Sequence, residues 1–315
     1  SPAFSLDSDD TTFSDAELTV IQKVWMRVAE DFAPFDVNVT TQEPPPDLSN
    51  LLRSGSTDDT YGFRAVITRD FTGSTTQGSC GCGGFSYVDV IGRTNNGYYM
   101  PSYIFFDKLS SNEKYIAEAV SHELGHALGL SHDGTSTTGY YSGQGTGTTS
   151  WAPIMGVGYS KNVTQWSKGD YPDANNLEDD LAIIQRNLPL RADDVGNTYA
   201  QSKSLTVTTP GAMNALASDG IIEKSGDVDV FNFYAAPGTV SFTIRGPDLG
   251  QNVDILTELR DAAGNILASS NPVDDIKASI TANVPAAGQY FLVVTGVAKG
   301  DLTTGYPIYA SIGQY

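Results

Sequence analysis

The chain has 315 residues, of which 37 are Asp or Glu and 18 are Lys or Arg, so its formal charge at neutral pH is −19. Such an acidic surface repels nucleic acids and anionic lipids, and we expect neither as a partner. No apolar run approaches the roughly 20 residues of a membrane-spanning helix, so we expect no membrane insertion. The length favours two domains over one.

Three segments in the first 190 residues have the hydrophobic spacing of helices. The first, residues 14–32, opens with Ser and Glu at the spacing of a capping box. The second covers residues 110–128 and is predicted to end at Gly129, because glycine readily adopts the left-handed conformation. A long loop rich in Gly, Ser, Thr and Tyr follows, and the third helix is predicted over residues 176–188.

Short strands are predicted between the first two helices. Each candidate is rich in β-branched and aromatic residues and is bounded by Pro, Gly, Asn or Asp. The four segments are residues 35–41, 63–69, 85–92 and 103–107.

The pattern changes to a period of two after about residue 200. Val240, Phe242 and Ile244 alternate with polar residues. The same spacing relates Ile255, Thr257 and Leu259, and also Tyr290, Leu292 and Val294, and turn-forming sequences separate these segments. We therefore predict an antiparallel β-sandwich with a hydrophobic core of its own. The predicted domains are residues 1–190 and residues 191–315.

All three histidines of the chain lie close together in sequence, at His122, His126 and His132. The first two are four residues apart on a predicted helix, so their rings project from the same face one turn apart. Gly129 lets the chain turn, so that His132 can return to the same point. Three neutral imidazoles occupy three of the four tetrahedral positions of zinc and leave one open, as in catalytic zinc sites. We predict one Zn²⁺ bound by these three residues.

Glu123 directly follows the first of these histidines. In such a site its carboxylate can accept a proton from a zinc-activated water that attacks a peptide carbonyl, and can then protonate the leaving amine. Glu123 is therefore the predicted general base.

The stretch HELGHALGLSHD, residues 122–133, resembles the signature of the metzincin zinc endopeptidases, H-E-x-x-H-x-x-G-x-x-H followed by a family-specific residue. Asp133 in that last position is similar to the adamalysin, or reprolysin, branch. The resemblance implies a Met turn, a hydrophobic base beneath the zinc, and Met155 is the matching residue. It also implies an α+β catalytic domain with a twisted mixed sheet and three helices.

Two features depart from the family pattern. Branches that use a Tyr as an extra zinc ligand place it two residues after the Met, where this chain has Val157. Tyr159 lies four residues after the Met, and we do not assign it as a ligand. A metzincin sheet also has a strand before its first helix; here either residues 3–7 supply it or it lay upstream of Ser1.

The strand order implied by the resemblance makes residues 84–92 the edge strand, which in this family pairs antiparallel with an extended substrate. We expect the residues at its start to contact the substrate: Gly84, Phe85, Ser86 and Tyr87. The preceding glycines let the backbone approach a peptide closely, although a flexible turn explains them as well.

Residues 193–315 resemble the bacterial pre-peptidase C-terminal domains, which are β-sandwich modules appended to secreted proteases. The resemblance rests on the order and spacing of three stretches, SGDVDVFNFYAAPGTVSFTI, LTELRDAAGNILASS and PAAGQYFLVVTG. In relatives such modules serve secretion or substrate attachment, and some bind calcium. Possible calcium ligands are the carboxylates of Asp193, Asp194, Asp227 and Asp229, although aspartates in loops are commonly solvated or cap turns.

The sequence therefore predicts a secreted, extracellular bacterial zinc endopeptidase that is a monomer and acts on proteins or peptides. The chain starts at Ser1 without Met or a signal peptide, as expected of a processed form, and the cysteine usage also weakly favours secretion. Cys80 and Cys82 form either a small disulfide or two free thiols. The alternative is a matrix- or surface-binding adhesin with a vestigial protease domain, which the intact Glu123 disfavours. Metal-dependent hydrolysis of a substrate other than a peptide is a third hypothesis.

Overall fold

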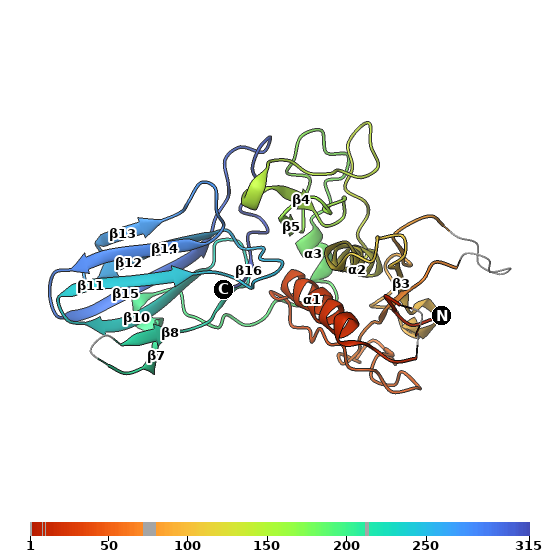
Figure 1. Ribbon diagram of the computed structural model, residues 1–315, viewed down its shortest axis with the longest axis horizontal. Helices are drawn as coiled ribbons and strands as arrows, with labels where there is room; N and C mark the ends of the chain where they lie inside the picture. The colour runs from red at the N-terminus through yellow and green to blue at the C-terminus, as the bar shows by residue number, and fades with distance from the viewer. Residues whose placement is uncertain (1, 8, 10, 72–79, 212–213) are drawn as a thin grey trace.

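The computed structural model describes residues 2–7, 9, 11–71, 80–211 and 214–315. Helices gather at one end of the molecule and long strands at the other (Figure 1). This arrangement confirms the predicted fold class, an α+β region followed by a β-rich region. Within the described residues, no helix is long and apolar enough to cross a membrane.

The helical region contains α1 (Asp15–Asp31), α2 (Glu113–Leu128) and the short α3 (Asp180–Ile184). The capping box predicted for the first helix is present, because Ser14 accepts from the backbone of Glu17 and the Glu17 side chain accepts from the backbone of Ser14. The second helix begins after Asn112, whose side chain accepts from two backbone N–H groups of the first turn. It ends at Gly129, with a φ of 113°.

A three-stranded mixed sheet lies beside α2. Its strands are β1 (Ala65–Thr68), β3 (Ser102–Phe105) and β2 (Gly84–Phe85), in that spatial order. The pair β1–β3 is parallel and the pair β2–β3 is antiparallel, so β2 forms one edge. Ile104 of the central strand is fully buried in the core that α1 and α2 share.

Two predicted strands are wrong in extent. Residues 35–41 form only an isolated bridge, between Phe35 and Leu190. Backbone carbonyls of this segment accept hydrogen bonds from side chains instead of pairing with the sheet. Val39 O accepts from the Trp25 indole and Val37 O from the Arg191 guanidinium.

The predicted strand at 85–92 is likewise much shorter than expected. The pairing with β3 ends at Phe85, and the chain bends at residues 88–89. The N–H groups of Asp89 and Val90 donate to the carbonyls of His126 and Ala127 at the end of α2. The unpaired carbonyls of a helix end therefore take up the backbone donors that a strand would have used.

Two other predictions differ from the structure near the sheet and α3. Residues 3–7 carry no strand, although Thr68 donates to Pro2 O at 2.8 Å and Phe4 packs on Phe106. The third helix starts at Asp180 instead of residue 176, because the Glu178 carboxylate accepts from Ser131 of the loop after α2.

Short elements connect these parts. They are η1 (Asn96–Tyr99), η2 (Gly147–Thr149), β4 (Trp151–Pro153), β5 (Val163–Gln165) and η3 (Tyr199–Gln201). Strands β4 and β5 are parallel and lie in the long loop that follows α2.

The C-terminal region is a mostly antiparallel β structure. One sheet has the order β13-β12-β15-β10-β6, and β11 pairs with β14. The long strands are β10 (Val228–Ala235), β11 (Gly238–Ile244), β12 (Ile255–Asp261), β13 (Ile266–Ser270), β14 (Ala278–Val284) and β15 (Gly288–Gly296). The short strands are β6 (Lys203–Ser204), β7 (Thr206–Thr209), β8 (Ala215–Ala217), β9 (Ile221–Ile222) and β16 (Gly313–Gln314). The pair β10–β6 is parallel, an exception to the expected antiparallel order.

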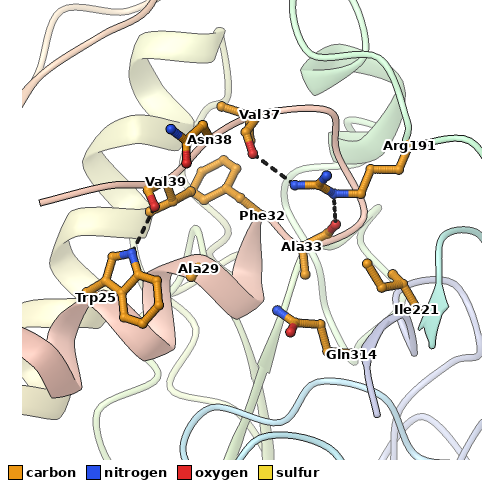
Figure 2. A pocket seen from close by; sticks show the side chains of 10 residues that line it. All are labelled: Trp25, Ala29, Phe32, Ala33, Val37, Asn38, Val39, Arg191, Ile221 and Gln314. Atoms are coloured by element: carbon orange, nitrogen blue, oxygen red, sulfur yellow. Dashed lines mark hydrogen bonds between the residues drawn. The ribbon is translucent and has the colours of Figure 1, made fainter. Parts of the chain in front are cut away.

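The two regions share one hydrophobic core instead of having a separate core each. Buried residues of α1 and α2 belong to the same contiguous cluster as buried residues of β10, β12 and β15. Polar contacts reinforce the junction, because the buried Glu30 carboxylate accepts from the backbone N–H groups of Asn252 and Gln314. Figure 2 shows the adjoining hollow, with Trp25 at the left, Arg191 at the right and Gln314 below.

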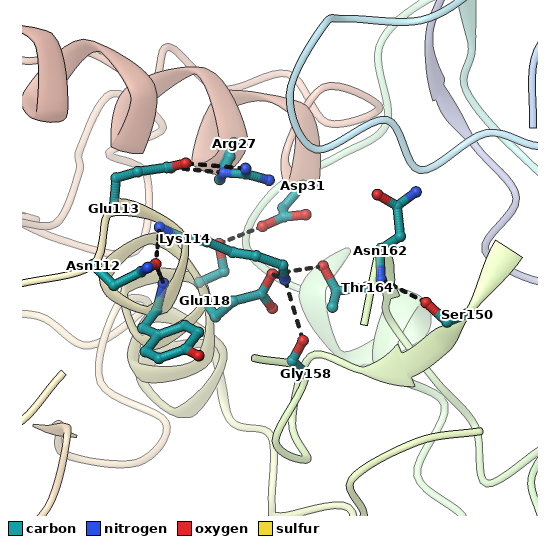
Figure 3. Close-up of polar contacts among 12 residues, drawn as sticks. Arg27, Asp31, Asn112, Glu113, Lys114, Glu118, Ser150, Gly158, Asn162 and Thr164 are labelled. Atoms are coloured by element: carbon teal, nitrogen blue, oxygen red, sulfur yellow. Dashed lines mark hydrogen bonds and ion pairs between the residues drawn. The ribbon is translucent and has the colours of Figure 1, made fainter. Parts of the chain in front are cut away.

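A polar network joins the two long helices to the loop after α2 (Figure 3). The Arg27 guanidinium pairs with Glu113 at 2.9 Å, and the Lys114 ammonium pairs with Glu118 at 2.6 Å. Asp31 accepts from the Ser121 hydroxyl at 2.6 Å, and burial raises the pKa of this carboxyl to about 7. The network holds α2, and hence the residues on its last turns, against α1.

Candidate metal centre

The three histidines converge on one point. One ring nitrogen from each of His122, His126 and His132 lies within 4.8 Å of the others. The first two project from the last turns of α2, and His132 follows the left-handed turn at Gly129. The Nε2 atoms of His126 and His132 are 2.9 Å apart. The structure thus confirms the convergence that the spacing predicted.

Backbone carbonyls orient two of these rings. His122 Nδ1 lies 2.9 Å from Ile154 O, and His126 Nδ1 lies 2.8 Å from Leu130 O. A proton on each Nδ1 donates to the carbonyl and leaves Nε2 as a free electron pair, which is how metal-binding histidines are commonly held. The donor set therefore fits zinc.

The protonation state of the histidines also suits a metal. Burial, and next the nearby His126, lowers the pKa of His122 to about 3. Burial is likewise the main cause that lowers the pKa of His126 and of His132. All three imidazoles are therefore neutral at physiological pH, as ligation requires.

The Glu123 side chain lies between α2 and the edge strand. It is buried, and burial raises the pKa of its carboxyl to about 8. Its carboxylate approaches Gly84 of β2 so closely that a Cβ at residue 84 would lie 2.6 Å from Glu123 Oε1. The residues predicted as general base and as start of the substrate-binding strand are thus neighbours.

Met155 lies beneath the histidine-bearing part of α2. Its side chain is fully buried, and a Cβ added to Gly125 would lie 2.4 Å from its sulfur. Its carbonyl accepts from the backbone N–H of Asp133, and the preceding carbonyl orients His122. The position agrees with a hydrophobic base under the metal site.

Asp133 is buried behind the third histidine. The Tyr171 hydroxyl lies 3.4 Å from its Oδ1, and its Oδ2 has no hydrogen-bond partner among the described residues. Burial raises the pKa of the Asp133 carboxyl. Asp133 thus belongs to the support of the site and does not face its open side.

Tyr140 is a neighbour of the histidines that the sequence did not indicate. Its ring centroid lies 4.4 Å from that of His132 and 6.0 Å from that of His122. Burial, and next the charge of Glu123, raises the pKa of its hydroxyl. Tyr140 comes from the long loop, eight residues after His132, where neither periodicity nor a motif marks it.

The residues after Gly84 lie along the sheet edge. Phe85 and Tyr87 are exposed, and the Ser86 hydroxyl lies 2.7 Å from that of Ser102 on the neighbouring strand. Of the two states considered from the sequence, a small disulfide or two free thiols, the structure has the disulfide between Cys80 and Cys82.

A second cluster of possible metal ligands lies in the C-terminal region. Carboxylate oxygens of Asp193, Asp227 and Asp229 lie within 4.8 Å of one another, while Asp194 lies beside this group and pairs with Lys203 at 3.8 Å.

The sequence reasoning missed Glu223 at this cluster. Its Oε2 and Asp229 Oδ1 are buried without a hydrogen-bond partner among the described residues. Burial raises the pKa of each of these two carboxyls to about 8. Glu223 directly follows β9. Only the tertiary fold brings it to the aspartates, and no local sequence pattern marks it.

Comparison with known proteins agrees with this geometry. No curated protein matches the chain. Among solved structures, the chain is similar to the pre-peptidase C-terminal domain of a collagenase from Bacillus anthracis, with 17% identity over 31% of this chain and 80% of that chain, and a TM-score of 0.23. Residues 36–167, which include the three histidines, match the family model Reprolysin_5, metallo-peptidase family M12. The N-terminal region of this chain is therefore a reprolysin-like metallopeptidase domain of family M12, a family of zinc peptidases.

Proposed function

We propose that the protein is a secreted zinc endopeptidase whose zinc is held by His122, His126 and His132. The observation that carries this proposal is the convergence of three neutral imidazoles beside a buried carboxylate and an open sheet edge. Zinc, when bound, supplies a Lewis acid that lowers the pKa of water and polarises a carbonyl.

The residues of the chain have distinct roles in this proposal. Glu123 accepts the proton of the attacking water and then delivers it to the leaving amine. Burial alone raises the pKa of this carboxyl to about 8. The positive charge of a bound zinc would lower the pKa again and favour the ionised form that accepts a proton. Met155 supports the histidine-bearing helix from below, and β2 orients the substrate as an added strand.

We place the peptidase domain at residues 1–190 and the β-sandwich at residues 191–315. The family match supports this division, because it ends at residue 167 and includes every residue of the proposed zinc site.

Replacing Glu123 by Gln tests the function. The amide is close in shape but cannot accept the proton, so we expect Glu123→Gln to keep one zinc per chain by metal analysis and to lose most peptide cleavage, roughly 100-fold or more. Glu43→Gln is the control and should stay active, because Glu43 is exposed in the segment after α1. A Glu123→Gln variant within tenfold of the parent would rule out this residue as the base, and a parent that cleaves no peptide would favour the adhesin hypothesis.

We also propose that Asp193, Asp227 and Asp229 bind a calcium ion, with Glu223 as a further ligand. Calcium takes six to eight oxygen ligands, and an unpartnered buried carboxylate oxygen is costly unless a cation compensates it.

Calcium should therefore raise the melting temperature of the zinc-loaded parent, because a ligand at 100 times its Kd stabilises the folded state by about 2.7 kcal/mol. The rise should be absent in Asp227→Asn and present in Asp248→Asn, an exposed residue of the same region. Equal rises in both variants would contradict a site at this cluster.

A further inference from the structure

Exposed aromatic side chains form a continuous row beside the edge strand. Phe85 is 45% exposed, Tyr87 44% and Tyr98 81%. Their rings are linked through Tyr99 by edge-to-face contacts, with centroids 5.3 Å apart for Phe85–Tyr87, 5.3 Å for Tyr87–Tyr99 and 5.1 Å for Tyr98–Tyr99. We call these four residues the aromatic row. Scattered exposed apolar side chains are ordinary, whereas a contiguous group indicates a binding surface.

The aromatic row starts at Phe85, the residue after Gly84, and Gly84 lies against the proposed general base, Glu123. Successive residues of a strand face opposite sides of the sheet. Phe85 therefore faces the side away from Glu123, where it pairs with Tyr103 of β3. The row then continues along the chain away from Glu123.

The backbone at this edge is oriented to receive a peptide. Gly83 O accepts from Phe105 N at 2.8 Å, and alternate residues of an antiparallel strand bond to the partner strand. The N–H and C=O of Gly84 consequently point away from β3. The carbonyl lies 2.8 Å from Cys82 Sγ, and the N–H points toward the open side of β2. A peptide that pairs there adds a strand directly beside Phe85.

We propose that the aromatic row binds substrate side chains on the N-terminal side of the cleaved bond and selects aromatic and large apolar residues there. This inference rests on the proposed peptidase function and on antiparallel pairing along β2. A peptide antiparallel to β2, with its cleaved bond beside Glu123, runs its N-terminal residues past Phe85 and Tyr87. Its alternate side chains then face the rings.

The chemistry of the row favours rings and branched aliphatic groups over charged ones. Aromatic pairs meet edge to face or offset, with centroids 4.5 to 7 Å apart, and the exposed faces of the row offer such contacts to a substrate. The Arg93 guanidinium lies over Tyr99 at 5.5 Å and pairs with Asp89 at 3.9 Å. Arg93 thus packs against Tyr99, the ring that joins Tyr87 to Tyr98.

The test compares two sets of fluorogenic peptides that are identical after the cleaved bond. One set carries Phe or Leu at the positions before it and the other carries Gly or Asp. The parent should cleave the first set with higher kcat/KM. In Phe85→Ala and Tyr87→Ala the ratio of kcat/KM for the Phe peptides to kcat/KM for the Gly peptides should shrink by roughly 3- to 10-fold for each ring removed.

Tyr234→Ala is the matched control, because Tyr234 is 78% exposed on β10 in the other region. Binding of the labelled Phe peptide to the Glu123→Gln chain, with and without Tyr87→Ala, gives a readout independent of turnover. Equal losses for Phe and Gly peptides, or no loss for either, would overturn the proposal. A parent that cleaves neither set would instead overturn the peptidase function itself.

Discussion

At the scale of single residues, the glycine at position 84 is explained by the carboxylate opposite it. Gly84 has no side chain, and an added Cβ would lie 2.6 Å from Glu123 Oε1 and 2.7 Å from its Cγ. Those atoms belong to the outer part of a side chain that can rotate. An Ala at 84 is therefore accommodated by moving Glu123, at little cost in stability and at the expense of its alignment.

We expect Gly84→Ala to lower kcat by about 10- to 100-fold, because misplacing a reacting group by about 1 Å can cost that much. KM, zinc content and melting temperature should change little, since the histidines and the core are not touched. Gly55→Ala is the control, because a Cβ at Gly55 meets no atom within 4 Å. A rise in KM with kcat unchanged would show that Gly84 serves substrate pairing instead.

The convergence of the three histidines at the proposed zinc site could be predicted from the sequence because their geometry is local. His122 and His126 share a helix face by spacing alone, and Gly129 marks the turn that returns His132. Tyr140 and Glu223 could not be predicted in this way. Each reaches its cluster through a loop path that the tertiary fold determines, and neither has a periodic or motif-based signal.

At the scale of elements, helices were predicted more accurately than strands. The helices α1 and α2 carry their own start and stop signals, in the capping box at Ser14 and the left-handed turn at Gly129. A strand needs a partner that lies elsewhere in the sequence. Residues 35–41 and 86–92 have the composition of strands, but their backbone groups bond to helix ends and side chains nearby.

The alternating segments of the C-terminal region are an informative exception. The predicted segment 240–244 lies in β11, which pairs with β14 along its full length, and Ile244 points into the core while Thr243 and Arg245 stay exposed. Alternation predicted this strand correctly because one face is buried and the other is solvated. It gave no indication of the parallel contact between β6 and β10.

At the scale of the whole molecule, the C-terminal region packs against the long loop that follows α2 in the peptidase domain. Trp151 and Tyr171 of the long loop pack in one buried cluster with Ile276 and Tyr306 of the C-terminal region. The Gln165 side chain donates to Asn252 O at 2.5 Å, and the segment around Gln165 orients Ile154 through a backbone bond. Ile154 in turn bonds to His122 at the proposed zinc site.

Because the two regions share buried clusters, removal of the C-terminal region should affect the peptidase domain as well. A core of its own in each region would allow a cut near Arg191, but a chain that ends there exposes the shared core to water. It also removes Asn252 and Gln314, whose backbone N–H groups donate to Glu30, so that this buried side chain becomes exposed. Exposing apolar surface to water is unfavourable. We therefore expect the shortened chain to melt at a clearly lower temperature, to bind zinc more weakly and to lose cleavage of short peptides as well as of proteins. Circular dichroism, metal analysis and peptide cleavage on both chains measure these effects. Equal melting temperatures together with equal kcat/KM on a short peptide would show that the contacts across the junction contribute nothing to the site.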